Sequence, residues 1–137
     1  MKRILIVDDE PDVRALLKTR LMANGFEVFE ASDGGSGVTL AQQKNPNLIL
    51  LDILMPGQDG VETYHKLKSD PVTKGIPVIF LTALAERISA TKQGLELEES
   101  YAVLGKPYRA DELIQEIRHA LGFPILEEQR EDRDKKA

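Results

Sequence analysis

The chain has 137 residues, of which 42% are hydrophobic and 30% are charged, a composition typical of one compact soluble domain with a single core. Its formal net charge is −5 and no basic stripe is present, which argues against direct nucleic-acid binding, because phosphate recognition needs clustered lysines and arginines. The absence of cysteine excludes disulfides, thiol nucleophiles and thiolate metal sites.

The N-terminal stretch MKRILIVDDE contains an apolar run of only four residues, 4–7, before acidic residues follow. Such a run is too short for the core of a signal peptide or for a membrane span. We therefore expect a cytoplasmic protein without membrane contact.

The first part of the chain alternates strand and helix patterns. Residues 4–7 are continuously apolar, as in a central strand of a parallel sheet covered on both faces. Helical spacing follows from Pro11, with apolar residues at Val13, Leu16, Leu17 and Leu21. The segment 26–30 nearly alternates and predicts an edge strand. A helix over 32–44 contains three glycines that each cost about 1 kcal/mol relative to alanine, so we expect it to begin late or to fray.

The same alternation continues through the second part of the chain. Residues 48–51 and 78–81 are apolar runs of the central type, whereas 101–104 is short and mixed, like an edge strand. Helical spacing is carried by two further sets of residues: Val61, Tyr64 and Leu67, then Leu113, Ile117, Ala120 and Leu121. The pattern predicts the α/β class, as a single doubly wound (βα)5 flavodoxin-like domain. Its parallel five-stranded sheet would have the order 2-1-3-4-5.

We expect this domain to occupy residues 1–122, followed by a charged C-terminal tail or the start of a linker over 123–137. The last eleven residues, EEQREDRDKKA, mix both charge signs and contain no large apolar side chain. The sequence therefore predicts either a stand-alone domain or one cut from a longer protein.

Polar side chains follow the predicted strands at their carboxyl ends, where open α/β sheets place ligand sites. Asp8 and Asp9 follow the first strand and Asp52 follows the third. Thr82 follows the fourth strand, and Lys106 follows the fifth. Because neighbouring strands lie about 4.8 Å apart and their carboxyl ends share one edge, we expect these side chains to converge.

Grouped carboxylates need a cation, since two unit charges 4 Å apart repel by about 4 kcal/mol at an effective dielectric constant near 20. A site with oxygen ligands alone favours a hard divalent ion, and Mg²⁺ with waters and phosphate oxygens suits it, with Mn²⁺ as a substitute. Asp52 could then attack a phosphoryl group and form an aspartyl phosphate. Lys106 would add positive charge and Thr82 a hydroxyl donor.

The same residues carry a family pattern. It consists of VDDE at 7–10, LLDILMPGQDG at 50–60, FLTA at 80–83 and KPY at 106–108, in this order and on the expected elements. Over nearly all of residues 2–121, the sequence resembles the receiver domain of two-component response regulators.

The resemblance implies that Asp52 is the phosphoacceptor. It also implies two further sets of site residues: metal ligands at Asp8, Asp9, Asp52 and the Leu54 backbone carbonyl, and phosphoryl contacts at Thr82 and Lys106. A sensor histidine kinase, a phosphotransfer protein or a small phosphodonor would phosphorylate Asp52. The surface of the fourth helix, fifth strand and fifth helix would then change and regulate an unknown output protein. By this resemblance the chain is a switch rather than a turnover enzyme, and a homodimer remains open.

Three positions near the site depart from the family pattern or vary within it. The family usually places an aromatic residue three positions before the lysine, where this chain has Val103, and whether Tyr101 replaces it is left open. Leu54 and Leu84 are apolar at positions that tune phosphoryl lifetime in the family. Because apolar groups there should hinder water, we expect slow autodephosphorylation.

Two other classes of function compete with the switch. A Mg²⁺-dependent phosphohydrolase would normally need a second acid near its nucleophile, where this chain has Leu54. A degenerate receiver would bind partners without phosphorylation, against which the complete Asp, Thr and Lys set argues. Taken alone, Asp8 and Asp9 before Pro11 could simply open a helix, because acids and proline favour the first helical turn.

Overall fold

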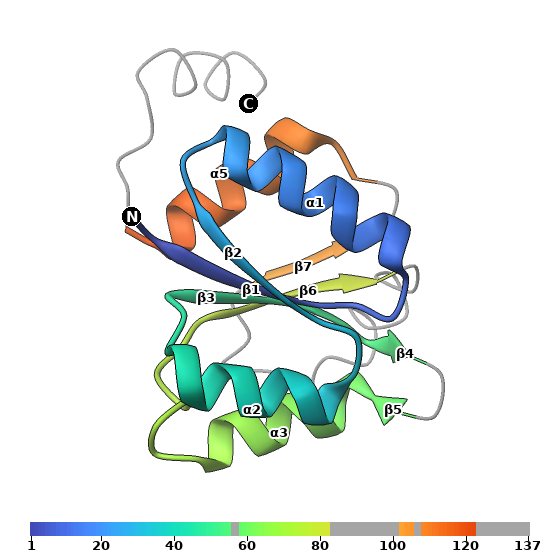
Figure 1. Ribbon diagram of the computed structural model, residues 1–137, viewed down its shortest axis with the longest axis vertical. Helices are drawn as coiled ribbons and strands as arrows, with labels where there is room; N and C mark the ends of the chain where they lie inside the picture. Colours follow the sequence, from blue (N-terminus) through green and yellow to red (C-terminus); the bar gives the residue numbers. More distant parts are fainter. Residues whose placement is uncertain (56–57, 83–101, 106–107, 123–137) are drawn as a thin grey trace, which may run out of the picture.

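The computed structural model describes residues 1–55, 58–82, 102–105 and 108–122. A five-stranded parallel sheet forms its middle layer, with helices on both faces (Figure 1). The strands lie in the order β2-β1-β3-β6-β7, which is the predicted order 2-1-3-4-5. Their bounds are β1 (Arg3–Val7), β2 (Glu27–Ala31), β3 (Leu48–Asp52), β6 (Val78–Thr82) and β7 (Ala102–Gly105).

Two helices cover each face of the sheet in the described part of the chain (Figure 1). One face carries α1 (Pro11–Ala23) and α5 (Ala110–Ala120), and the other carries α2 (Gly34–Lys44) and α3 (Gly60–Ser69). After β3, a short antiparallel pair is formed by β4 (Leu54–Met55) and β5 (Gln58–Asp59). A fourth crossover helix would fall on 83–101, outside the described residues. None of the described helices is long and apolar enough to cross a membrane.

The central strands are buried on both faces because alternate side chains enter two separate cores. In β1, Leu5 and Val7 join the cluster that contains residues of α2 and α3, whereas Ile4 and Ile6 join the cluster beneath α1 and α5. All five residues of β3 are buried. This two-sided burial explains why the central strands are continuously apolar.

The helix α2 differs from the expectation of a late or frayed start. It begins at Gly34 and includes all three glycines. Asp33 caps it, because its carboxylate accepts hydrogen bonds from the Ser36 backbone amide at 2.7 Å and the Ser36 hydroxyl at 3.0 Å. A Cβ at Gly37 would lie 2.8 Å from Cγ2 of Val7, so this glycine lets α2 approach β1. Packing therefore outweighs the low helix propensity.

One edge strand and one helix face also differ in detail from the sequence pattern. The strand β2 begins one residue later than expected, at Glu27. For β2 the reason is that the Phe26 amide donates to the Leu21 carbonyl, so Phe26 belongs to the end of α1. Leu16 fits the apolar spacing of α1, yet 53% of its surface is exposed, and Leu17 and Leu21 fill the core instead.

Candidate functional site

The strand register brings the predicted site positions to one edge of the sheet. Val7 of β1 pairs with Leu51 of β3, so the next residues, Asp8 and Asp52, emerge on neighbouring strands at the same level. Thr82 ends β6 on the other side of β3 and pairs with Gly105 of β7. Lys106, one residue further along, lies outside the described residues.

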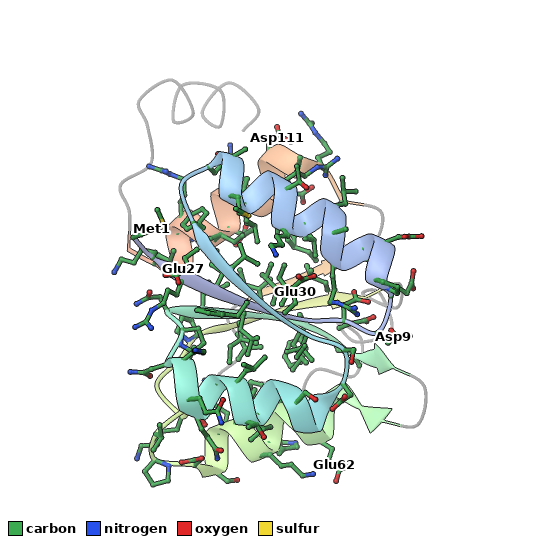
Figure 2. The ribbon with its side chains drawn as sticks, in the orientation of Figure 1. Met1, Asp9, Glu27, Glu30, Glu62 and Asp111 are labelled. Atoms are coloured by element: carbon green, nitrogen blue, oxygen red, sulfur yellow. The ribbon has the colours of Figure 1, made fainter. Side chains whose placement is uncertain are left out.

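Asp8 begins a tight acidic turn after β1. Its surface is only 1% exposed, and its Oδ1 atom accepts a hydrogen bond from the Glu10 amide at 2.9 Å. The carboxylates of Asp8, Asp9 and Glu10 each bring one oxygen within 4.8 Å of the others. Figure 2 shows Asp9 on this turn, near the start of α1. The turn therefore concentrates negative charge at the carboxyl edge of the sheet.

The acidic turn leads directly into α1. The helix starts with Pro11 at its first position, as expected from the sequence. Its N-cap residue is Glu10, which forms no side-chain capping hydrogen bond. The Asp8 carboxylate binds the Glu10 amide, so it also orders the turn that precedes the helix.

Asp52 ends β3 as a buried carboxylate, with 4% of its surface exposed. The chain returns directly behind it, because the Gly60 amide donates to the Ile53 carbonyl at 3.0 Å. A Cβ on Gly60 would lie 2.5 Å from both the Asp52 carbonyl oxygen and Cα of Ile53. Only glycine fits there, so the start of α3 fixes the backbone of Asp52.

The described acidic groups fit a hard divalent ion by their chemistry and, in part, by their spacing. Opposite ligands of an octahedral Mg²⁺ lie about 4.2 Å apart, and the oxygens of the acidic turn lie within 4.8 Å of one another. Among the described residues, Asp52 does not complete a set of three with Asp8 and Asp9 at that spacing. Direct ligation of one ion by all three carboxylates would thus require them to move closer together, or a bridging water.

Two residues with a clear place in this site were not identified from the sequence. Glu10 shares the acidic turn, and only its position directly after Asp8 and Asp9 could have indicated this. Gly60 is the last residue of the motif LLDILMPGQDG. The neighbouring sequence does not show that a side chain here would collide with the carbonyl of Asp52, eight residues earlier. Leu54, whose carbonyl is the remaining predicted ligand, begins β4 opposite Asp59.

Comparisons with known proteins agree with the fold. The family model of the response regulator receiver domain matches residues 4–118. The chain is 43% identical over 124 residues to the probable transcriptional regulator ycf27 of Cyanophora paradoxa, in a match that covers 88% of this chain and 48% of that protein. It is 36% identical over 124 residues to protein PilH of Pseudomonas aeruginosa, covering 88% of this chain and 98% of PilH.

A solved structure adds a metal to the comparison. The response regulator TrrA of Thermotoga maritima, solved in complex with Mg²⁺-BeF, is similar with a TM-score of 0.76 and 33% identity, covering 88% of this chain and 99% of TrrA. The present chain spans about half the length of the ycf27 protein and nearly all of PilH and TrrA. On the match of residues 4–118 and these relatives, the chain belongs to the response regulator receiver domain family of two-component systems.

Proposed function

We propose that this receiver domain accepts a phosphoryl group on Asp52 and thereby switches its interaction with a protein partner. The observation that carries the proposal is the acidic turn of Asp8, Asp9 and Glu10 at the sheet edge where the buried Asp52 ends β3. Receiver domains are signalling switches rather than turnover enzymes, so the phosphoryl group would be a signal and not a product.

In the proposed transfer, a carboxylate oxygen of Asp52 attacks the phosphorus atom. The P–N bond of a kinase or phosphotransfer-protein phosphohistidine breaks, or the P–O bond of acetyl phosphate, and the leaving imidazole or acetate takes the electron pair. Mg²⁺, or Mn²⁺ in its place, would neutralise charge on the transferring oxygens. We assign its ligands to Asp8, Asp9, Asp52 and the Leu54 carbonyl, and phosphoryl contacts to Thr82 and Lys106.

The proposed output surface lies beyond the acceptor along the sheet. It consists of the fourth helix, β7 and α5, and is supported by the pairing of β7 with the strand that Thr82 ends. We place the domain boundary near residue 122, because α5 ends at Ala120 and the Gly122 amide closes it on the His119 carbonyl. Residues 123–137 would be a tail or linker. The proposed setting is the cytoplasm, with no direct contact to nucleic acid.

The test is the intact mass of the protein after incubation with acetyl phosphate, with and without Mg²⁺. We expect a gain of one phosphoryl group that requires Mg²⁺ and is absent in Asp52→Asn. Asp70→Asn is the matched control, since it makes the same change at a half-buried carboxylate after the end of α3, and it should be phosphorylated like wild type. An unmodified wild type that is folded would leave a kinase-only acceptor or a non-phosphorylated binding module.

A further inference from the structure

Hydrogen bonds hold both the amide and the carbonyl of Asp8. The amide bonds directly to β2, and the carbonyl bonds to an arginine that pairs with β2. The Asp8 amide donates to the Ala31 carbonyl at 3.1 Å. Its carbonyl accepts a hydrogen bond of 2.6 Å from Nη1 of Arg14, which lies on α1. Nε of the same guanidinium lies 3.6 Å from Oε1 of Glu30, the residue before Ala31. Arg14 therefore ties the first residue of the acidic turn to both α1 and β2.

Arg14 brings a positive charge close to the turn, and Glu30 offsets that charge. The Arg14 side chain is only 17% exposed and that of Glu30 is 32% exposed. Figure 2 shows Glu30 on the side of the sheet that α1 covers. Glu30 also lies 3.5 Å from Nζ of Lys18, one turn further along α1. Because partly exposed ion pairs contribute little to stability, the hydrogen bond to Asp8 is the distinctive feature of Arg14.

We propose that Arg14 is a positioning residue for the divalent cation. By holding the Asp8 carbonyl, it keeps the turn in the geometry that gathers the carboxylates of Asp8, Asp9 and Glu10, while Glu30 neutralises its charge. The inference rests on the proposed Mg²⁺ requirement. It is distinct from it, because it concerns a residue that touches the backbone of a ligand and not the metal.

Positioning and simple electrostatics predict opposite effects for the loss of Arg14. If the guanidinium acted only through its charge, its removal would strengthen Mg²⁺ binding, because a repelling cation would be gone. If it positions the turn, its removal weakens binding. Groups that orient metal ligands typically change affinity by about 10-fold to 100-fold.

The experiment is isothermal titration of the full chain with Mg²⁺ alone. We expect Arg14→Met to raise the Kd for Mg²⁺ by about 10-fold, at the lower end of such effects. Lys18→Met is the matched control, since it removes one positive charge paired with Glu30 without touching Asp8. That variant should stay within about twofold of wild type or bind slightly more tightly.

A conservative variant and a stability measurement separate positioning from general destabilisation. Arg14→Lys keeps the charge but lacks the planar guanidinium, whose separate nitrogens reach Asp8 and Glu30 at the same time. We therefore expect an intermediate Kd. Arg14→Lys also provides the test of positioning if Arg14→Met does not fold. A merely structural role would lower the Tm of the metal-free protein without changing the Kd. Equal Kd values for Arg14→Met and Lys18→Met, or tighter binding by Arg14→Met, would overturn the inference. A wild type that binds no Mg²⁺ would instead refute the metal requirement itself.

Discussion

The two strand ends that carry the central carboxylates are built in different ways. At the end of β1, Asp8 is held by hydrogen bonds from three directions, through Ala31, Arg14 and the Glu10 amide. At the end of β3, Asp52 pairs with Leu81 of β6, and Gly60 packs against its backbone without space for a side chain. An acidic turn held mainly by polar contacts can adjust, whereas a strand end enclosed by a neighbouring strand and a closely packed glycine cannot. The first should respond to changes of charge and the second to changes of volume.

The largest effect is expected from Gly60→Ala. The new Cβ would lie 2.5 Å from backbone atoms, which cannot rotate away as a side chain can. We expect a loss of about 3 kcal/mol in the free energy of unfolding, at the upper end of overpacking costs, measured by urea denaturation. Gly75→Ala is the control, because nothing lies within 4 Å of its Cβ position. If both variants unfold at the same urea concentration, close packing does not fix Asp52.

Asp8→Asn should change metal affinity and stability in opposite directions. The amide oxygen can still accept the hydrogen bond from Glu10, but one charge leaves a group whose oxygens lie within 4.8 Å of one another. We expect the Kd for Mg²⁺ to rise at least 10-fold. The metal-free protein should gain about 1 kcal/mol in unfolding free energy from reduced repulsion.

Titration calorimetry and urea unfolding without metal test this pair of effects. Asp12→Asn removes a neighbouring charge from the first turn of α1, outside the acidic group, and should change the Kd little. A metal-free Asp8→Asn protein less stable than wild type would show that the buried carboxylate is stabilised by its hydrogen bonds more than it is penalised by its neighbours.

The sequence could predict the sheet and its order because that information is local and periodic. The continuous apolar runs of β1, β3 and β6 identify strands buried on both faces, and their sequence of crossovers limits the order. The position of Asp52 at a buried strand end follows from the same pattern. These features needed no knowledge of which side chains touch.

The missed features depend on contacts between distant parts of the chain. The start of α2 is determined by Asp33 and by the fit of Gly37 against Val7, thirty residues earlier, which no propensity of residues 32–44 contains. The sequence around Gly60 indicates only a turn, although the structure shows that glycine is needed because the backbone of Asp52 lies so close. Helical spacing alone does not separate Leu16 from Leu17 and Leu21, because all three fit an apolar helix face. Only the packing of the folded chain leaves Leu16 exposed and the other two buried.

Gly37→Ala tests whether close packing matters at β1 as well. Alanine favours a helix over glycine by about 1 kcal/mol, but its Cβ would lie 2.8 Å from Cγ2 of buried Val7. We expect a net loss of about 1 kcal/mol, since the overpacking cost of about 1–3 kcal/mol exceeds the gain. Combining it with Val7→Ala should remove the clash, so the two changes should not be additive in urea unfolding. Additive losses would mean that α2 adjusts freely.

The smallest effect is expected at the Asp33 cap and should depend on pH. Hydrogen bonds from the Ser36 amide and hydroxyl hold the pKa of the Asp33 carboxyl below its ordinary value of 3.8. A lowered folded-state pKa contributes stability above the unfolded value, and that contribution is lost as pH falls through the folded value. Asp33→Ala should therefore lower the Tm slightly at pH 7, and the difference should shrink below about pH 3.8. A difference that persists unchanged at lower pH would assign the cap to something other than the ionised carboxylate.

The contact between Gly60 and the Asp52 carbonyl also has a mechanical consequence. The first residue of α3 lies so close to the backbone of Asp52 that the helix cannot move nearer to β3, and a displacement of Asp52 toward the helix would move the helix as well. The end of β3 and the start of α3 should therefore move together as one rigid unit. If Asp52 accepts a phosphoryl group as proposed, we expect the resulting displacement on the other side of this residue, toward the end of β6.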